Sequence, residues 1–350
     1  MGLFGRDRDL NQAPDRVELC VDASAMGLKV DDVHVRLDNF LQQHLSWRSR
    51  SSIQRLVKDG WLYVDAATPD HPHGCGELQQ EIRPGRKLKH GSRVVVIIPP
   101  ELRLPAPEGE TGEVTVIYED EACIAVDKPP LMPVHPSGRH VNDTLIQRVH
   151  ARHPELLERG RAPRLCHRLD RETSGIVLVA KEPRFHPELS RQFEDREVEK
   201  EYLAVVRGVP IEDRGRIELP LGPARASAVR LKMAVQADGM PSRTDWNTVE
   251  RHVNHALLAV RLYTGRQHQI RVHLAAIGHP IVGDKLYAYD ESYFQRSVAG
   301  ELTAKDWAAL ELPRQALHNH RLVFTSPVTS ERVEVVAPLP ADLAGFLEAR

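Results

Sequence analysis

A stretch rich in proline, glycine and glutamate, PPELRLPAPEGETGE (99–113), interrupts the chain and limits what it can fold into. Such a composition forms a semi-rigid linker and does not contribute strands or helices to a core. It therefore predicts two separately folded units, residues 17–100 and 114–350, joined by a linker at 101–113. The 350 residues are enough for two such units. Residues 1–16 are polar, and we expect them to be disordered.

Two helices are predicted in the first unit. Apolar residues recur at helical spacing in VRLDNFLQQHL (35–45) and in SRSSIQRLVKDG (49–60). Ser49 or Ser51 can cap the second helix, and Gly60 is placed to end it. Between residues 46 and 58 the chain has four basic residues and no acid, namely Arg48, Arg50, Arg55 and Lys58. This run indicates a solvated helix face or a nucleic-acid contact, although the net charge of −2 is not that of a basic nucleic-acid-binding chain.

Short apolar runs predict strands in both units, and helical patterns separate them irregularly. The runs are WLYVD (61–65), RVVVIIPP (93–100), IVLVA (176–180), EYLAVVRG (201–208), ALLAVRLY (256–263) and RVEVVAP (332–338). Helical patterns lie near 143–150 and over 268–277, and Gly278 ends the second of them. Because helices and strands do not alternate strictly, the pattern predicts an α+β fold rather than a doubly wound sheet.

Composition excludes several classes of protein. Hydrophobic residues make up 41% of the chain and charged residues 27%, which is ordinary for a globular protein. No apolar run approaches the roughly 20 residues that a membrane helix needs, and the N-terminus lacks the apolar segment of a secretory signal. The four cysteines are scattered and form no C-x-x-C pair. We therefore expect a cytoplasmic protein without disulfides and without a membrane partner.

Asp170 stands between two arginines, just before a turn and a strand that is predicted to be buried. The stretch is RAPRLCHRLDRETSGIVLVAK (161–181), with the turn at 173–175. A carboxylate on a loop fixed to a rigid strand is typical of a functional site. Arg168 and Arg171 would favour its ionised form. The structural alternative is that Asp170 caps the turn or pairs with an arginine.

Two later stretches favour the functional interpretation. EYLAVVRG holds Tyr202 in a strand, and TGRQHQIRVHLAAIGHPIVGD (264–284) gathers Arg266, His268 and Arg271 at a strand-to-helix junction. Each could be structural alone, but together and in this order they are more specific. A metal site is only weakly indicated. The chain has no H-E-x-x-H motif, and HPHGC (71–75) lies in a turn-rich loop without a distant partner motif.

These stretches resemble the signatures of the RluA-type family of RNA pseudouridine synthases. HRLDRETSGIVLVAK, EKEYLAVVRG and TGRQHQIRVHLAAIGHPIVGD match its three main signatures almost letter for letter. IYEDEACIAVDKPPLMPVHP resembles its opening strand and turn, although Pro130-Leu131 stands where Pro/Ala-Gly is usual, and LPRQALHNHRLVF resembles its late signature. The resemblance spans roughly residues 114–338. It implies a mixed, largely antiparallel sheet core with flanking helices.

Residues 17–100 resemble the small S-four-type RNA-binding domain of ribosomal and RNA-modifying proteins, an α/β module. RLDNFL, SRSSIQRLVKDGWLYVD and KLKHGSRVVV carry this resemblance. It implies that the basic helix contacts RNA phosphates, which position a protein without reading sequence. The segment AATPDHPHGCGELQQ (66–80) is longer than the family's usual hairpin, and Asp65 stands where Asn is common.

The resemblance also implies a role for each site residue. Asp170 matches the catalytic aspartate, which acts on a uridine within RNA as nucleophile or as acid/base group. Arg271 matches the basic residue that pairs with this aspartate, and Tyr202 matches the tyrosine that stacks on the target base. Arg168 matches the arginine that fills the space left by the flipped nucleotide. The uracil leaves the ribose and rejoins it through carbon, so no cofactor or metal is expected.

We therefore expect an enzyme that isomerises uridine to pseudouridine in structured RNA. Large-subunit ribosomal RNA is the expected substrate and tRNA the alternative, with Arg266 and His268 as further RNA contacts. The rival hypothesis is a ribosome-assembly factor that binds RNA without reacting, and the intact set Asp170, Tyr202 and Arg271 argues against it. Metal-dependent RNA hydrolysis lacks the clustered carboxylates that it requires. A monomer is expected.

Overall fold

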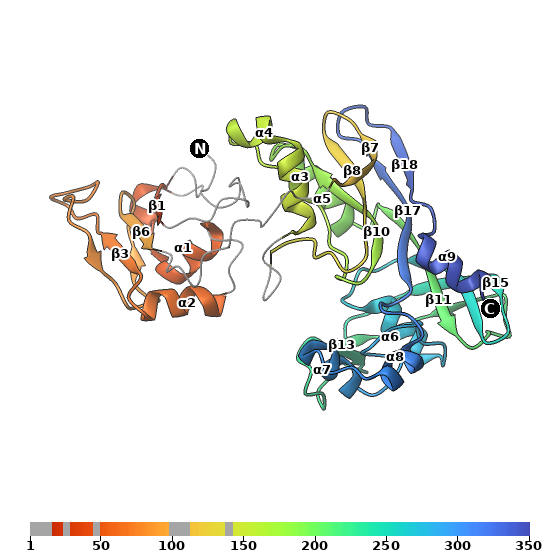
Figure 1. Ribbon diagram of the computed structural model, residues 1–350. Coiled ribbons are helices and arrows are strands. Elements are labelled where there is room, and N and C mark those ends of the chain that lie inside the picture. Colours follow the sequence, from red (N-terminus) through yellow and green to blue (C-terminus); the bar gives the residue numbers. More distant parts are fainter. Residues whose placement is uncertain (1–15, 24–28, 45–49, 98–112, 137–142) are drawn as a thin grey trace. The chain divides into compact units, whose positions relative to one another are not determined.

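The computed structural model describes residues 16–23, 29–44, 50–97, 113–136 and 143–350 (Figure 1). The chain divides into two compact units. The first consists of Met1–Glu113 and His135–Pro163, and the second of Val114–Val134 and Arg164–Arg350. Most of the predicted linker lies outside the described residues. Arg16, which the sequence placed in a disordered terminus, instead begins a strand and pairs with Ile97.

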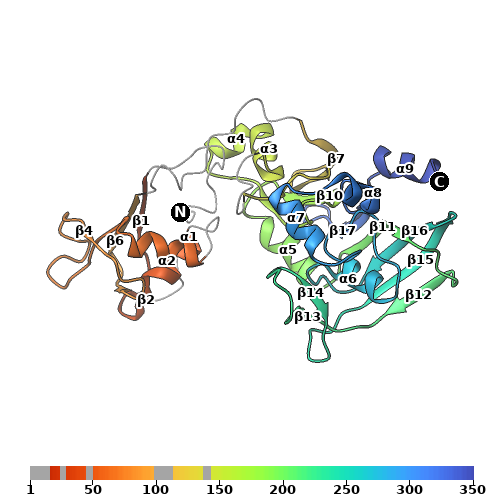
Figure 2. The same ribbon diagram turned by 60° about the horizontal axis from the view of Figure 1, so that its bottom comes forward.

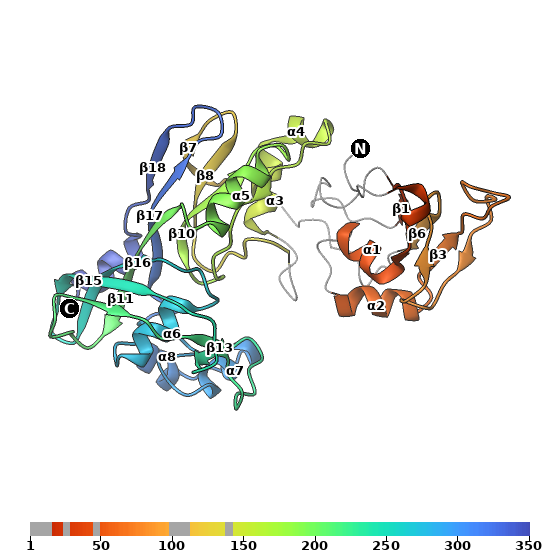
Figure 3. The ribbon, with the colours of Figure 1, turned by 180° about the vertical axis from the view of Figure 1, so that it is seen from behind.

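The first unit contains a small antiparallel sheet and several helices. The sheet has the order β1-β6-β3-β4, formed by β1 (Arg16–Cys20), β6 (Arg93–Ile97), β3 (Leu62–Asp65) and β4 (Gln79–Gln80). A separate ribbon pairs β2 (Val35–Arg36) with β5 (Lys87–Leu88). The helical elements are η2 (Val30–Asp32), α1 (Leu37–His44), α2 (Arg50–Lys58), α3 (Leu145–Arg152) and α4 (Pro154–Glu158). Figure 3 shows α1 and α2 on one face of the sheet.

Helix α2 follows the sequence pattern closely. Ile53, Leu56 and Val57 are buried in one core with residues of α1, β3 and β6, because i, i+3 and i+4 positions share a helix face. Gly60 ends the helix with a φ of 81°, as predicted. Ser51 does not cap the helix, since it lies within it. Ser49 lies outside the described residues.

The described strands of the second unit form one ten-stranded sheet and a short ribbon. The path through the sheet is β12 (Arg214–Ile217), β15 (Thr244–Arg251), β16 (His255–Leu262), β11 (Glu199–Arg207), β17 (Leu317–Thr325), β10 (Ser174–Ala180), β8 (Cys123–Lys128) and β7 (Thr115–Glu119). β18 (Arg332–Val336) pairs with β17, and β9 (Arg164–Leu165) with β10. β13 (Leu221–Pro223) and β14 (Met233–Val235) form the ribbon. Among these described pairs, only β10–β17 is parallel.

Helices flank this sheet. They are α5 (His186–Glu194), α6 (Gln269–Ala276), α7 (Ser292–Ala299), α8 (Ala304–Leu310) and α9 (Ala341–Glu348). Helix α5 packs on β10 and β17 and shares a buried apolar core with β8, β10 and β17. Helix α6 contacts β14, and Figures 1 and 2 show it beside the β13–β14 ribbon. None of the helices in the described part of the chain is long and apolar enough to span a bilayer.

The predicted fold class is confirmed: the second unit is α+β, with a mixed and largely antiparallel sheet and flanking helices. Each predicted strand run coincides with an observed strand, namely β3, β6, β10, β11, β16 and β18. The helical patterns near 143–150 and over 268–277 correspond to α3 and α6. The division of the chain assigns His135–Pro163 to the first unit, whereas the sequence grouped these residues with the second.

Candidate active site

Asp170 lies on the tight turn that leads into β10. The backbone N–H of Thr173 donates to the carbonyl of Asp170 at 3.1 Å and closes this turn. At Gly175, with a φ of 107°, an added Cβ would lie 2.3 Å from the backbone oxygen of Asn319 on β17. Glycine is therefore required for the parallel pairing of β10 with β17. This pairing fixes the Asp170 turn beside the segment that enters β17.

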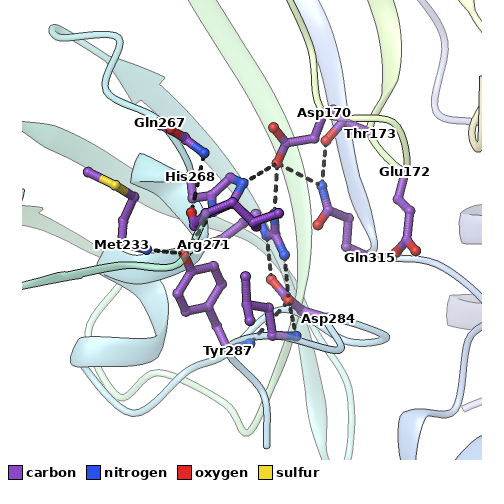
Figure 4. Close-up of polar contacts among 12 residues, drawn as sticks. Asp170, Glu172, Thr173, Met233, Gln267, His268, Arg271, Asp284, Tyr287 and Gln315 are labelled. Atoms are coloured by element: carbon purple, nitrogen blue, oxygen red, sulfur yellow. Dashed lines mark hydrogen bonds and ion pairs between the residues drawn. The ribbon is translucent and has the colours of Figure 1, made fainter. Parts of the chain in front are cut away.

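An ion pair joins Asp170 to Arg271 in the first turn of α6 (Figure 4). Arg271 Nη1 donates to Asp170 Oδ2 at 2.8 Å. Its Nε and Nη2 atoms donate to the two oxygens of Asp284 at 2.7 and 2.8 Å. Asp284 is fully buried and also accepts the backbone N–H groups of Leu286 and Tyr287. The bidentate contact fixes the plane of the guanidinium, so that the remaining nitrogen is directed at Asp170.

Burial and charge oppose each other at these groups. Burial acts to raise the pKa of Asp170, but the charge and the hydrogen bond of Arg271 outweigh it and hold this pKa below its ordinary value. Burial acts to lower the pKa of Arg271, and the adjacent Asp284 and Asp170 carboxylates raise it above its ordinary value. The site therefore holds an ionised carboxylate beside a permanent cation at neutral pH.

The two oxygens of Asp170 have different surroundings. Oδ2 contacts Arg271, lies 3.4 Å from Gln315 Nε2 and lies 3.8 Å from His268 Nε2. Oδ1 has no hydrogen bond or ion pair with any residue in the described part of the chain. In Figure 4 the dashed lines at Asp170 meet at its other carboxylate oxygen. The side chain keeps 33% of its surface exposed, whereas that of Arg271 keeps 9%. Oδ1 is therefore the oxygen that is open to a substrate.

Tyr202 lies on β11 at a β-bulge, paired with Val260 of β16 and Asn319 of β17. It is 7% exposed. Burial raises its pKa, and the negative charge of Asp170 raises it further, so that the phenol is neutral at physiological pH. The structure thus brings Tyr202 into the electrostatic range of Asp170, as a neutral ring rather than a phenolate.

A second set of contacts holds the Asp170 turn. Gln315 Nε2 donates to Thr173 Oγ1 at 2.6 Å, and its backbone N–H donates to Glu172. Lys285 Nζ reaches both carboxylate oxygens of Glu172 at 2.9 Å. The fully buried Lys128 donates to the carbonyls of Pro129, Met132 and Arg171. Burial and the charge of Arg314 lower the pKa of Lys128 to about 7.

The structure separates the predicted site residues into two groups. Asp170, Arg271 and His268 lie within one network, and the charge of Asp170 reaches Tyr202. Arg168 is exposed and makes no ion pair with the described residues. The resemblance implied that Arg271 pairs with Asp170, and Arg271 is the ion-pair partner of Asp170 among the described residues. Arg171 lies 3.8 Å from Glu172.

The remaining predicted RNA contacts are distributed over both units. Arg266 is partly buried, and its Nε atom donates to the carbonyl of Pro241 at 3.5 Å. Arg50, Arg55 and Lys58 are exposed on α2, with Arg50 3.6 Å from Asp38. Arg48 lies outside the described residues.

Sequence reasoning did not single out Asp284, Tyr287 or Gln315. Asp284 and Gln315 stand inside the two motifs GRQHQIRVHLAAIGHPIVGD and LPRQALHNHRLVF, and Tyr287 follows the first by three positions. Their presence within or next to these motifs, as polar residues without an assigned role, was the signal that could have identified them. Their partners are distant in sequence, however, so only the folded chain shows what they contact.

Comparisons with known proteins agree with this geometry. Residues 122–276 match the family model described as RNA pseudouridylate synthase. A ribosomal large subunit pseudouridine synthase D of Nitrosomonas europaea is 34% identical over 95% of this chain and 87% of its own length. An RNA pseudouridine synthase of Aquifex aeolicus is 36% identical over 77% of this chain and 82% of its own length.

A solved structure supports the same assignment. The chain resembles human RNA pseudouridylate synthase domain containing 1 with a TM-score of 0.54 and 27% identity, over 68% of this chain and 89% of the human one. The predicted RluA-type family is thereby confirmed for the part of the chain that carries the Asp170 site. The sequence, the fold and the relatives together show that this chain belongs to the RNA pseudouridine synthase family and is an RNA-modifying isomerase.

Proposed function

We propose that this enzyme converts uridine to pseudouridine in large-subunit ribosomal RNA and that Asp170 carries the chemistry. The observation that supports the second part is the Asp170–Arg271 ion pair, in which Oδ2 is occupied and Oδ1 is open. A nucleophile or base must be ionised and must have a free oxygen, and Asp170 meets both conditions.

The reaction is an isomerisation whose atoms balance without a co-reactant. The bond between ribose C1′ and uracil N1 breaks, the uracil turns, and a bond between C1′ and C5 forms. The proton on C5 leaves, and N1 gains one. Asp170 Oδ1 acts on the ribose in the first step, as nucleophile or as base. Arg271 keeps the carboxylate ionised and oriented, and the neutral ring of Tyr202 stacks on the base.

The target uridine leaves its stack to reach this site. Unstacking a nucleotide costs a few kcal/mol, and a side chain that fills the vacated space repays part of this cost. Arg168 is suited to this role because it is exposed, lies two residues before Asp170 and makes no ion pair with the described residues. Arg266 and His268 lie in the loop just before α6, and His268 borders the same site.

The substrate class is supported by relatives that cover most of this chain. The Nitrosomonas europaea protein and a Neisseria meningitidis protein, 36% identical over 89% of this chain, are both named for the ribosomal large subunit. Pseudouridine mapping of total RNA from cells with and without the gene tests this. Loss of signals in large-subunit ribosomal RNA is expected, and loss confined to tRNA would contradict the assignment.

The substitution Asp170→Asn tests the catalytic role. Asn keeps the shape of Asp and caps turns equally well, but it is neither a nucleophile nor a base at neutral pH. We expect pseudouridine formation to be abolished while RNA affinity and the melting temperature stay close to those of the parent. Asp195→Asn, at an exposed position after α5, is the matched control and should remain active. Near-normal turnover of the Asp170→Asn variant would refute the assignment.

A further inference from the structure

Tyr287 connects the catalytic pair to a strand that lies outside it. Its hydroxyl accepts the backbone N–H of Met233, the first residue of β14, at 2.9 Å. The same hydroxyl lies 2.7 Å from His268 Nδ1. On the other side of the imidazole ring, Nε2 lies 3.8 Å from Asp170 Oδ2. Figure 4 shows this series of contacts from Met233 through Tyr287 and His268 to Asp170.

These partners determine which nitrogen of His268 carries the proton. The Met233 N–H can only donate, so the Tyr287 oxygen is its acceptor. The tyrosine proton then needs an acceptor, and His268 Nδ1 is the one it meets among the described residues. If Nδ1 carried the proton instead, the Tyr287 proton would lack an acceptor in a largely buried place, which costs about 1–3 kcal/mol. Neutral His268 therefore carries its proton on Nε2.

We propose that Tyr287 fixes His268 as a neutral Nε2–H donor and that this N–H donates to the target uracil beside Asp170. The role rests on the proposed function of Asp170 and adds a substrate contact to it. At 3.8 Å, Nε2 is beyond hydrogen-bond range of Oδ2, which already receives Arg271 and Gln315. An acceptor oxygen on the bound nucleotide can take this proton.

The charges around His268 agree with a neutral ring. Burial and the adjacent Arg271 guanidinium lower the pKa of His268 to about 4, against the opposing effect of the Asp170 and Asp284 carboxylates. Tyr287, the fourth group that faces the ring, is itself neutral because burial raises its pKa. An imidazolium here would form an ion pair with Asp170 and reduce the reactivity of the carboxylate.

The backbone also holds His268 in one orientation. His268 has a φ of 56° and precedes α6, in the left-handed region that residues other than glycine rarely adopt. The side chain of the preceding residue, Gln267, donates to the carbonyl of Leu231 at 3.2 Å. The imidazole packs edge-on against Tyr287, with 5.6 Å between the ring centroids. A strained residue that its surroundings hold in place is a feature of functional sites.

The Nε2–H of His268 can stabilise the uracil as it leaves the ribose. When the bond between C1′ and N1 breaks, the uracil departs with negative charge that spreads to its carbonyl oxygens. A fixed, neutral N–H directed at one of these oxygens stabilises that charge without forming an ion pair with the catalytic carboxylate. Removal of one such donor from an oxyanion site typically costs about 100-fold to 1000-fold in kcat.

Two substitutions of His268 test the donor role. His268→Leu removes the N–H, and we expect kcat to fall about 100-fold, with KM changed much less. His268→Gln places an amide N–H near the position of Nε2–H, and we expect it to restore most of the lost kcat. Melting temperatures of both variants show whether the fold is retained. Equal losses of kcat in the two folded variants, or no loss in His268→Leu, would overturn the proposal.

Tyr287→Phe tests the tautomer of His268 through the pH profile of kcat. If Tyr287 had a purely structural role, the substitution would not shift this profile. Without the tyrosine proton, Nδ1 is free to accept a proton, so the pKa of His268 rises above about 4, although burial and the Arg271 guanidinium still hold it below its ordinary value. We expect the acid side of the kcat profile to lie at a higher pH in the variant than in the parent enzyme, because the variant protonates His268 more readily. A profile of unchanged shape would contradict the proposal.

The matched control is Tyr289→Phe. The Tyr289 hydroxyl donates to the carbonyl of Ala309 and receives Arg207, and it has no contact with His268 or Asp170. This variant should keep the kcat and the pH profile of the parent. Failure of the proposed function would appear as an active Asp170→Asn variant. Failure of the present proposal would appear in the His268 and Tyr287 variants while Asp170→Asn stays inactive.

Discussion

At the scale of single residues, the site is a chain of fixed charges that ends in one open oxygen. Backbone N–H groups hold Asp284, Asp284 holds two nitrogens of Arg271, and the third nitrogen holds Asp170 Oδ2. The side chain of Asp284 is fully buried and that of Arg271 nearly so, and neither can therefore turn away into solvent. The cost of burying these charges is offset only while all partners are present.

Asp284→Ala should therefore destabilise the protein strongly. It would leave the buried Arg271 with Asp170 as its remaining carboxylate among the described residues, and removal of one partner of a buried ion pair costs roughly 3–5 kcal/mol. Chemical denaturation of the variant and of the parent measures this cost. The exposed Asp195→Ala is the control, and a cost below about 1 kcal/mol for Asp284→Ala would contradict this account.

Arg168 should matter more for folded RNA than for a short unstructured RNA. Its proposed role, filling the space that the flipped uridine leaves, exists only where there is a stack to vacate. Comparison of Arg168→Ala turnover on a structured RNA and on a single-stranded oligonucleotide tests this. Equal losses on the two substrates would instead indicate a role at Asp170 itself.

At the scale of elements, α2 combines a buried face with a basic one. Ile53, Leu56 and Val57 fill the core of the small sheet, and the same periodicity exposes Arg50, Arg55 and Lys58. An exposed basic helix face contributes little to stability, so its charges are available for phosphate contacts. We propose that α2 positions the enzyme on RNA without taking part in the chemistry.

Replacement of Arg50, Arg55 and Lys58 by alanine should weaken RNA binding and reduce its salt dependence. Each lost phosphate contact lowers the slope of log K against log salt by about 0.7 to 0.9. Affinity measured at several salt concentrations gives this slope. Alanine at the exposed basic residues Arg159, Arg214 and Lys305 removes the same charge elsewhere and is the control. The same slope in both variants would refute a specific role for α2.

At the scale of the whole molecule, several buried histidines link stability to pH. Burial lowers the pKa of His318 and His268 to about 4 and that of His167 to about 3. In the unfolded chain each titrates near pH 6.5. Between pH 6.5 and pH 4 these histidines are neutral in the folded protein and protonated in the unfolded chain. Unfolding therefore takes up protons, and the free energy of unfolding decreases as the pH is lowered.

We therefore expect the melting temperature to decrease steadily below about pH 6.5. Each of these histidines contributes up to about 1.4 kcal/mol per pH unit in that range. The carboxylates with lowered pKa, such as Asp38 at about 2, add to the loss only below about pH 4, their ordinary range. Thermal melting in buffers from pH 8 to pH 5 measures the effect. A constant melting temperature from pH 7 to pH 5 would contradict it.

Much of the fold was present in local sequence patterns. Strand runs such as IVLVA and helix stripes such as Ile53, Leu56 and Val57 depend on residues within a few positions of one another, and β10 and α2 appear where those patterns predict them. Asp170, Tyr202 and Arg271 could likewise be identified from the sequence, because each stands within its own short motif. The exceptions, such as Ser51 and the strand residue Arg16, lie at element ends, where short-range preferences are weak.

The site itself was decided by the tertiary structure. Asp170 meets Arg271 across 101 positions and Gln315 across 145, because β10 pairs with β17 and the turn before it faces the start of α6. Nothing local to Asp170 distinguishes this distant arginine from the two beside it. The proton on His268 Nε2 likewise depends on Tyr287 and on the backbone of Met233 in another strand. The sequence determined which side chains were available, and the pairing of distant strands determined which oxygen and which proton face the substrate.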